Sequence, residues 1–265
     1  MSNDFKLIIK KFTENHDIRI YPIADIHLGA EECMEREWGQ FCNDVLNDPY
    51  AYITLGGDLI NNSTRNSVGN GVYRDIYSPR EQKRRIAEAL MPLRDRILCG
   101  VEGNHEARSS KESDDSIMYD IFCKLDLEHI YREHMAFVKI QIDASKNNGT
   151  TKGTKNPTYV LCVTHGSGGG MTGASVNRNE KYGYMLSGVD ALITGHCHKP
   201  FVTQPSRINV DSHNNRITLV PFKVCSATSW LTYGGYAMQK MLMPSSFAPQ
   251  VMTLSGDHKE IKVTM

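Results

Sequence analysis

Gly195-His196-Cys197-His198 follows directly on an apolar run, Val189–Thr194, that has the composition of a buried strand. Two histidines one residue apart at a strand end can both reach a metal if the chain bends there, and Gly195 permits such a bend. Alone, a His-x-His pair is a weak signal because it is common by chance. It gains weight here because the earlier strand-like runs also end in His, Asp or Asn clusters, usually beside glycine.

The earlier strand ends carry the same residue types. The clusters are Asp25-Ile26-His27 after residues 17–24, Gly57-Asp58 after 51–55, Gly103-Asn104-His105 after 97–101, and His165-Gly166 after 159–164. Because the carboxyl ends of strands in an open α/β sheet converge on one crevice, we expect these side chains to meet there. The expected ligands are Asp25, His27, Asp58, Asn104, His165, His196 and His198. Seven oxygen and imidazole ligands are too many for one tetrahedral zinc and suit two metal ions that share a carboxylate.

The first half of the chain alternates strand and helix patterns. Apolar residues at helical spacing predict a helix over residues 31–47. Ser78, Pro79 and Glu81 have the pattern of a helix start with a capping box. Another helix is expected from Ser113-Asp114-Asp115 through Leu125, because these polar residues are suited to cap it. This alternation is typical of an α/β protein.

Beyond His198 the strand patterns dominate. Strands are predicted over residues 201–210, 216–226, 251–254 and 260–263, and the polar stretch 145–157 is expected to be a hairpin loop. The change from βαβ units to hairpins predicts two mixed sheets packed face to face with helices outside. We find no repeat and no domain boundary, so a single domain over residues 1–265 is expected.

The amino-acid composition indicates which kinds of binding partner and which cellular compartment to expect. Thirty basic and thirty acidic residues cancel, so no whole-chain field favours nucleic acid or an anionic membrane. The seven cysteines are odd in number and lie mostly in apolar runs, which favours free thiols in a reducing compartment. No signal peptide is recognisable, and no apolar run approaches the roughly 20 residues of a membrane helix. We therefore expect a soluble cytoplasmic protein without membrane contacts, bacterial or, if phage-encoded, in the host cytoplasm.

As a set, the motifs resemble those of the calcineurin-like metallophosphoesterase superfamily. Its five blocks read D-x-H, G-D-x-x-[D/N], G-N-H-[E/D], a strand ending in His, and G-H-x-H, and all five occur in order within residues 18–200. The resemblance implies a four-layer α/β/β/α sandwich. It also implies that one metal ion is held by Asp25, His27, Asp58 and His198, and the other by Asp58, Asn104, His165 and His196.

The resemblance further implies a mechanism and a cofactor. Hydrolysis is expected to follow attack by a metal-activated hydroxide on phosphorus. His105 is assigned to protonating the leaving oxygen, a general-acid role that suits imidazole near neutral pH. The ligand types admit Mn, Fe, Zn, Ni or Co, and we expect manganese. Cys197 is expected to be a packing residue and not a ligand.

The chain departs from the protein Ser/Thr phosphatases of this superfamily, which carry G-D-x-V-D-R-G. Asn61 and Asn62 stand where those proteins have an Asp that orients the catalytic His and an Arg that grips phosphate. An amide can accept a hydrogen bond from imidazole but cannot stabilise imidazolium as a carboxylate does, which disfavours a phosphoprotein phosphatase. Asn61, Arg65 and Arg108 are therefore the candidate substrate contacts, and the loops 61–77 and 166–180 are expected to set specificity.

Three hypotheses for the function follow. The opening Ile23–Gly29 is similar to the repair-nuclease and small phosphodiesterase branches, which favours a phosphodiesterase acting on nucleic acid or nucleotides, DNA exonucleases included. The alternative is a phosphatase or phosphodiesterase for a small soluble ester, supported by the zero net charge and the lack of an appended nucleic-acid-binding domain. A non-catalytic scaffold is the third, disfavoured because every motif position keeps its ligand. The sequence leaves the oligomeric state open.

Overall fold

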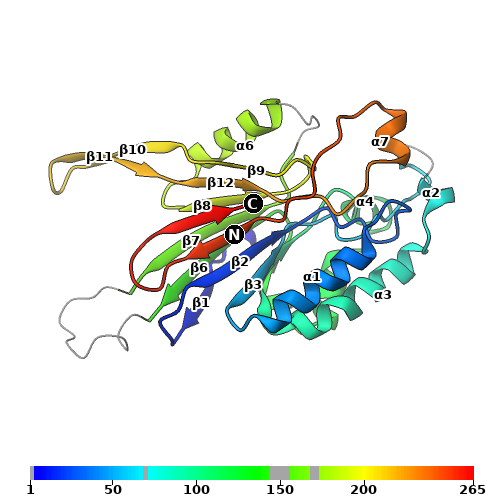
Figure 1. The fold of residues 1–265 in the computed structure, drawn as a ribbon, viewed down its shortest axis with the longest axis horizontal. Coiled ribbons are helices and arrows are strands. Elements are labelled where there is room, and N and C mark those ends of the chain that lie inside the picture. The colour runs from blue at the N-terminus through cyan, green and yellow to red at the C-terminus, as the bar shows by residue number, and fades with distance from the viewer. Residues whose placement is uncertain (1–2, 68–70, 144–155, 168–172) are drawn as a thin grey trace.

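The computed structural model describes residues 3–67, 71–143, 156–167 and 173–265. Its strands form two six-stranded sheets and a separate two-stranded hairpin (Figure 1). The first sheet has the order β1-β6-β7-β8-β12-β9, with strands Ile8–Phe12, Met135–Ile142, Thr158–Thr164, Ala191–Thr194, Lys223–Ser226 and Phe201–Thr203. The second has the order β14-β13-β2-β3-β4-β5, with strands Ile261–Thr264, Val251–Leu254, Ile18–Ile23, Ala51–Leu55, Ile97–Val101 and Tyr131–Arg132.

Both sheets are mixed, with a parallel core. In the second sheet β2, β3, β4 and β5 run parallel, and β13 is antiparallel to β2. In the first sheet β7, β8 and β12 run parallel. β6 is parallel to β1 but antiparallel to β7, and β9 is antiparallel to β12. All residues of β4 are buried, as expected for a parallel strand that is covered on both faces.

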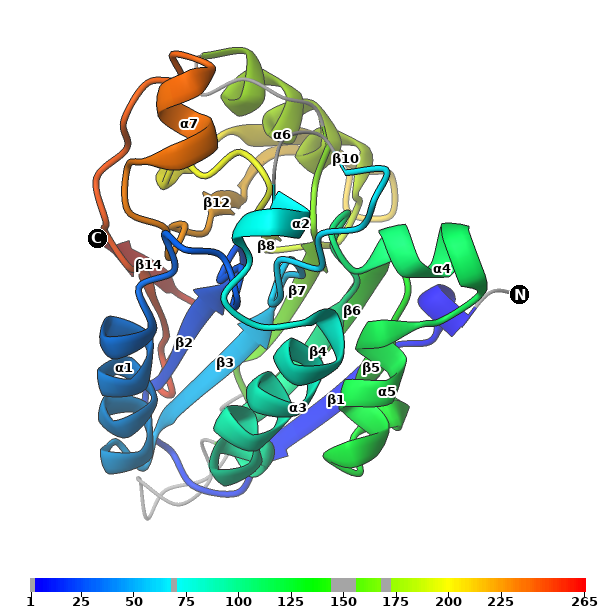
Figure 2. The ribbon, with the colours of Figure 1, turned by 90° about the vertical axis from the view of Figure 1, so that its right-hand side faces the viewer.

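Helices cover the outer face of each sheet (Figure 2). α1 (Glu35–Asn47), α3 (Pro79–Leu90) and α5 (Ile117–Lys124) lie beside the second sheet, and α6 (Gly173–Met185) contacts β8 and β12 of the first. Between the sheets β4 contacts β6 and β7, and one apolar cluster contains buried residues of both sheets. The predicted α/β/β/α sandwich of two mixed sheets flanked by helices is confirmed.

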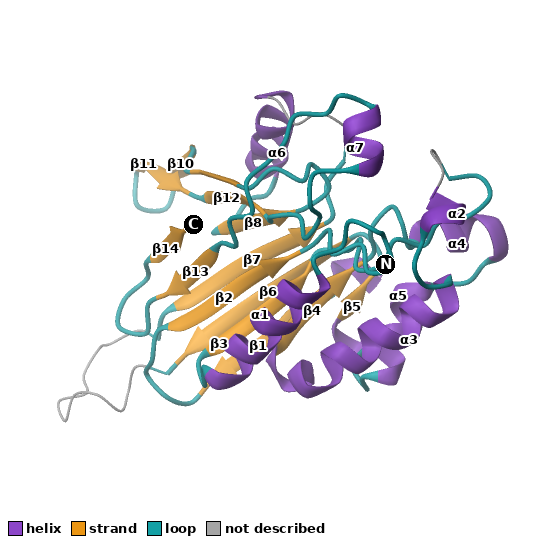
Figure 3. Cartoon of the chain, turned by 45° about the vertical axis from the view of Figure 1, so that its right-hand side comes forward, coloured by secondary structure: helices purple, strands orange, loops and turns teal. Residues whose placement is uncertain are grey.

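The short helices gather at one end of the sandwich. They are α2 (Gly71–Arg74), α4 (Ala107–Ser113) and α7 (Gly235–Gln239). Figure 3 shows loops crowded at the same end, where the sheets' parallel strands end, while the longer helices run along the sheets. Within the described parts of the chain, no helix has the length and hydropathy needed to cross a bilayer.

The hairpin of β10 (Ser206–Asp211) and β11 (Arg216–Pro221) projects from the first sheet as an arm (Figure 1). Ile208 pairs with Leu219 and Val210 pairs with Ile217, so these four side chains share one face of the arm. Each is at least 67% exposed. Only some of the apolar residues in the predicted strands 201–210 and 216–226 are therefore buried in the core.

Several predicted elements have different bounds in the structure. The helix predicted from Ser113-Asp114-Asp115 through Leu125 is α5, but it begins only at Ile117, with Ser116 as its N-cap residue. The preceding short helix α4 was not predicted, and Asp114 ends it with a left-handed φ of 57°. Ser78 caps α3 as predicted, with its side chain accepting from the Glu81 main-chain N–H. The carboxylate of Glu81, however, pairs with Arg84 and Arg85, so the reciprocal half of the capping box does not form.

The two late predicted strands are each divided. Gln204-Pro205 separates β9 from β10, because proline cannot donate to a sheet ladder, and Phe222 separates β11 from β12. The interval 166–180, expected to be a loop, contains the first part of helix α6 from Gly173. The hairpin loop predicted over 145–157 lies almost entirely outside the described residues.

Candidate metal centre and active site

Five loops at the carboxyl ends of strands β2, β3, β4, β7 and β8 meet at one end of the sandwich. Main-chain hydrogen bonds join them: Asp25 N–H donates to the Gly57 carbonyl at 3.1 Å, and Gly195 N–H donates to the His165 carbonyl at 3.0 Å. All seven predicted ligands lie on these loops. The structure brings them together in two adjacent groups.

The first group contains Asp25, His27 and His198. The Nε2 atoms of the two histidines are 3.2 Å apart, and Asp25 Oδ1 lies 3.5 Å from His198 Nε2 and 4.0 Å from His27 Nε2. Two nitrogens bound at 2.0–2.1 Å to a tetrahedral ion are separated by about 3.3 Å. The spacing of these side chains therefore fits a metal ion.

The second group contains Asp58, Asn104, His165 and His196. The Asn104 Oδ1 atom lies 2.9 Å from His165 Nε2 and 2.6 Å from His196 Nδ1, and those two nitrogens are 3.2 Å apart. Asp58 Oδ2 lies 3.3 Å from His165 Nε2. Neighbouring ligands of an octahedral ion at 2.0–2.1 Å are about 3.0 Å apart, so this group also has the dimensions of a metal site.

Asp58 lies between the two groups. Its Oδ2 faces His165 at 3.3 Å and His27 at 3.9 Å, while its Oδ1 accepts the main-chain N–H of His105 at 2.8 Å. One oxygen is thus held by the backbone, and the other faces both groups. A carboxylate in this position suits the predicted role of a bridging ligand.

The charges in these groups also suit cations. Burial alone would lower the pKa of His165, but the carboxylate of Asp58 raises it to about 10. Burial raises the pKa of Asp25 to about 8, with the charge of Asp58 adding to the effect. The buried carboxylates therefore favour additional positive charge. Burial lowers the pKa of His27 well below its usual value, so its imidazole is neutral, the form that binds metal ions.

The backbone of the ligand loops is strained. Five of the seven predicted ligands have left-handed φ angles: Asp25 (55°), His27 (51°), Asp58 (52°), His196 (69°) and His198 (53°). Asp, Asn and His enter this region more readily than other residues, yet each such position costs about 1–3 kcal/mol and persists only where the surroundings impose it. Strain of this kind concentrates at functional sites.

Two glycines allow the loops to approach one another. A Cβ on Gly103 would lie 2.2 Å from Asp58 Oδ1, and a Cβ on Gly195 would lie 2.5 Å from the Ala24 Cβ and 3.0 Å from Asp25 Oδ2. Gly195 was expected to supply the bend of the His-x-His segment. The left-handed residues there are instead His196 and His198, and Gly195 supplies close approach to the loop after β2.

Glu106 is a motif residue to which the sequence assigned no role. It is fully buried, and its carboxylate accepts four main-chain N–H groups. The donors are Asp58 (2.9 Å), Leu59 (2.6 Å), Ile60 (3.2 Å) and Gly103 (3.1 Å). Burial and the neighbouring charge of Asp58 raise the pKa of Glu106 to about 7, while the hydrogen bonds favour the carboxylate. Glu106 therefore holds the loop that carries Asp58.

His105 lies beside both metal-ligand groups, with its Nε2 3.9 Å from Asp58 Oδ2. Its Nδ1 donates to the main-chain carbonyl of Asn61 at 2.7 Å, and its Nε2 accepts from Arg108 at 2.9 Å. The Asn61 side chain was expected to take the place of the orienting Asp. It instead donates to Asp75 at 2.7 Å, and the Asn61 backbone orients His105.

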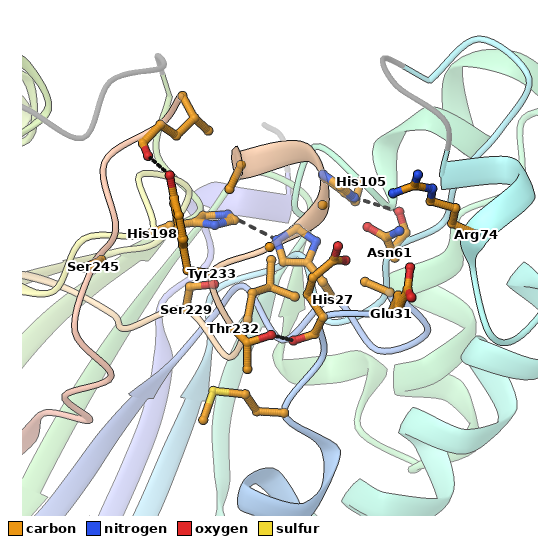
Figure 4. A pocket seen from close by; sticks show the side chains of 18 of the residues that line it. His27, Glu31, Asn61, Arg74, His105, His198, Ser229, Thr232, Tyr233 and Ser245 are labelled. Atoms are coloured by element: carbon orange, nitrogen blue, oxygen red, sulfur yellow. Dashed lines mark hydrogen bonds between the residues drawn. The ribbon is translucent and has the colours of Figure 1, made fainter. Parts of the chain in front are cut away.

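A cavity of about 1020 Å³ opens over the ligand groups (Figure 4). His27, Asn104, His105, His196 and His198 line it, together with Asn61 and Arg108. Arg65 is exposed and does not line this cavity, whereas Arg74, which the sequence did not single out, does. The cavity is also lined by parts of the segment 229–247, which lies far from the motifs in the sequence.

Cys197 stands between two predicted ligands but is directed elsewhere. Its Sγ lies 3.0 Å from the hydroxyl of Ser226 on β12. The seven cysteines are all free, and five of them, including Cys197, are buried. Cys197 thus packs against the first sheet, as predicted from its alternation with His196 and His198.

The fold and the two groups define an α/β/β/α protein with adjacent His/Asp clusters that can hold metal ions. No family model and no curated protein matches the chain. Among solved structures, a conserved Streptococcus pneumoniae protein described as a predicted phosphoesterase is 12% identical, with 94% of this chain and 97% of that chain covered and a TM-score of 0.32.

Two further solved structures are similar to the chain. A metallophosphoesterase of Sphaerobacter thermophilus is 12% identical over 94% of this chain and 89% of that chain, with a TM-score of 0.34. The NAD nucleotidase of Haemophilus influenzae is 10% identical over 94% of this chain and 49% of that chain, with a TM-score of 0.41.

Proposed function

We propose that this chain is a dinuclear metal-dependent phosphoesterase that hydrolyses phosphodiester bonds. The observation that carries the proposal is the position of Asp58 Oδ2 between two groups of ligand atoms, 3.3 Å from His165 and 3.9 Å from His27. Two divalent ions, which we expect to be manganese, would lower the pKa of a water molecule and neutralise phosphate oxygens when bound. The seven predicted ligands would hold them.

The other residues of the cavity would bind the ester and move a proton. His105 is oriented by the Asn61 carbonyl through Nδ1, so its Nε2 is the atom that would protonate the leaving oxygen. Arg108 donates to this Nε2 at 2.9 Å. Arg108 would therefore turn toward a phosphate oxygen when the ester binds, which would leave Nε2 free to take up a proton from solvent and then give it to the leaving oxygen.

The substrate proposed from the resemblance is nucleic acid or a nucleotide. The charges of the residues that line the cavity favour a small substrate over a long nucleic acid. Glu31, Glu32 and Asp75 line the cavity with Arg74 and Arg108, so three carboxylates face two guanidinium groups. A long polyanion requires a positive track along its backbone, whereas one phosphoester next to two metal ions does not. Within the first candidate this charge pattern favours a nucleotide over a long nucleic acid. It also supports the second candidate, a small soluble ester.

The test is hydrolysis by purified protein supplied with manganese. Substrates are bis-p-nitrophenyl phosphate, p-nitrophenyl phosphate, and end-labelled single- and double-stranded DNA, with Asp58→Asn as the blank. We expect turnover of the diester that is lost in the blank. DNA cleavage in addition would support the nuclease hypothesis, and diester turnover without it would support the small-ester hypothesis. Bound metal without turnover of any substrate would contradict the proposal.

A further inference from the structure

Part of the cavity wall is apolar and comes from the C-terminal segment. The residues are Leu231, Tyr233, Leu242, Met243 and Phe247, and they share the cavity with His27 and His198. We call them the apolar wall. Four of its members, all but Leu231, are 41–51% exposed. Apolar side chains left open to a cavity are the surface that an apolar part of a ligand covers.

The wall is tied to the metal-ligand loop. Trp230 N–H donates to the Asp25 carbonyl at 3.0 Å, and Met34 N–H donates to the Trp230 carbonyl at 2.8 Å. The Trp230 ring is buried and packs against Trp38 and against Phe247, with ring centroids 5.2 and 4.9 Å apart. The position of the wall relative to Asp25 is therefore set by backbone hydrogen bonds and by core packing.

Tyr233 presents its ring within this wall. Its hydroxyl donates to the Leu242 carbonyl at 2.8 Å, which fixes the far end of the side chain, and the residue is still 46% exposed (Figure 4). Figure 4 shows the Tyr233 side chain among the side chains that line the cavity. A ring held at both ends and open on its face is suited to stacking with a flat group of a ligand.

We propose that the apolar wall binds a ring-bearing substituent of the phosphoester, stacked on Tyr233, while the phosphate lies at the ligand groups. The inference rests on the proposed function for the placement of the phosphate. Charge disfavours a second anionic group on the substituent, because Glu31, Glu32 and Asp75 outnumber Arg74 and Arg108 around the cavity. The volume of about 1020 Å³ exceeds what a phosphate group alone fills. A nucleobase and a simple aryl group share the required chemistry.

The experiment measures binding of ligands that cannot be hydrolysed. Phenylphosphonate, methylphosphonate and a nucleoside phosphonate are titrated by calorimetry into the full chain supplied with manganese. Ring stacking predicts that phenylphosphonate binds about tenfold more tightly than methylphosphonate. Tyr233→Ala should abolish this preference, and Tyr233→Phe should keep it because the ring remains. Tyr73→Ala is the matched control, because Tyr73 is 91% exposed and does not line the cavity.

The outcomes separate this inference from the proposed function. Three outcomes would contradict the proposed role of the apolar wall, even if the protein is an active phosphodiesterase. They are equal affinity for phenylphosphonate and methylphosphonate, no binding of either, and a preference for phenylphosphonate that remains in Tyr233→Ala. A preference lost only in Tyr233→Ala would support the wall even if no diester is hydrolysed. Tighter binding of the nucleoside phosphonate than of phenylphosphonate would identify the ring as a nucleobase. Weaker binding would identify it as a simple aryl group.

Discussion

The Nε2 atoms of His27 and His198 lie 3.2 Å apart although 171 positions separate the two residues in the chain. His27 is buried, and both residues have left-handed backbone angles. Burial lowers the pKa of both imidazoles, that of His198 to about 4, so near neutral pH they are uncharged. Two neutral imidazoles in this arrangement are suited to share a cation.

Removal of metal should lower the thermal stability. An ion that binds the folded chain at a hundred times its Kd stabilises it by about 2.7 kcal/mol, which corresponds to a shift in Tm of roughly 5–10 °C for a chain of this size. Differential scanning calorimetry of chelator-treated protein, with and without added manganese, measures the shift. Identical transitions in both samples would argue against a metal centre.

Asp58→Asn should lose both bound metal and activity. The substitution removes the charge of the oxygen that faces both ligand groups while keeping nearly the same volume. Metal content by elemental analysis and turnover of bis-p-nitrophenyl phosphate are the measurements. Asp95→Asn is the control, because the Asp95 side chain is 92% exposed. An active Asp58→Asn variant with two metals bound would overturn the bridging role.

The His105→Ala variant should still bind metal, but its turnover should fall, and the fall should be greater for esters with a more basic leaving group. General acid catalysis contributes about 10²–10⁴-fold, and a p-nitrophenolate group needs little of it, so loss should be largest for an alkyl ester. Comparing kcat for methyl and p-nitrophenyl esters tests this. Full activity on the alkyl ester would refute the acid role, and loss of one metal would make His105 a ligand with His27 and Asp58, which lie close enough to allow it.

Glu106→Gln should destabilise the loop that carries Asp58. The amide would turn an NH₂ group toward main-chain N–H donors, and leaving buried donors unpaired costs about 1–3 kcal/mol each. Because Asp58 would shift with its loop, metal affinity should fall by about 10–100-fold. Urea unfolding and manganese titration measure the two effects. Glu88→Gln, at an exposed ion pair on α3, should change neither by a comparable amount.

Arg74→Ala should weaken substrate binding more than Arg65→Ala. Arg74 lines the cavity and Arg65 is exposed outside it, so only the first can pair with a phosphate oxygen there. A charge-assisted hydrogen bond to phosphate is worth about 1.5–3 kcal/mol, or about tenfold or more in KM. Steady-state kinetics of both variants on one diester provides the comparison. A larger effect at Arg65 would contradict this prediction and support Arg65 as the substrate contact, as expected from the sequence.

The residue types that end each strand, and the order of strands and helices, could be read from the sequence. These properties depend on side-chain periodicity and on turn residues a few positions apart, so the sandwich and the gathering of the seven predicted ligands at one end could be predicted. Element ends were less accurate where one residue decides them, as at Asp114 and Pro205.

How the strand ends come together as one site could be seen only in the folded chain. Three features depend on contacts between loops that lie far apart in the sequence. They are the left-handed φ angles of the predicted ligands, the four hydrogen bonds to the Glu106 carboxylate, and the hydrogen bond from His105 to the Asn61 carbonyl. The position of Arg74, and not Arg65, on the cavity also could not be read from the sequence. Nor could the apolar wall, because backbone hydrogen bonds between residues about 200 positions apart bring Tyr233 to the cavity. Such contacts arise when the two sheets pack together. The distances between the loops then depend on that packing and cannot be calculated from the number of residues between them in the sequence.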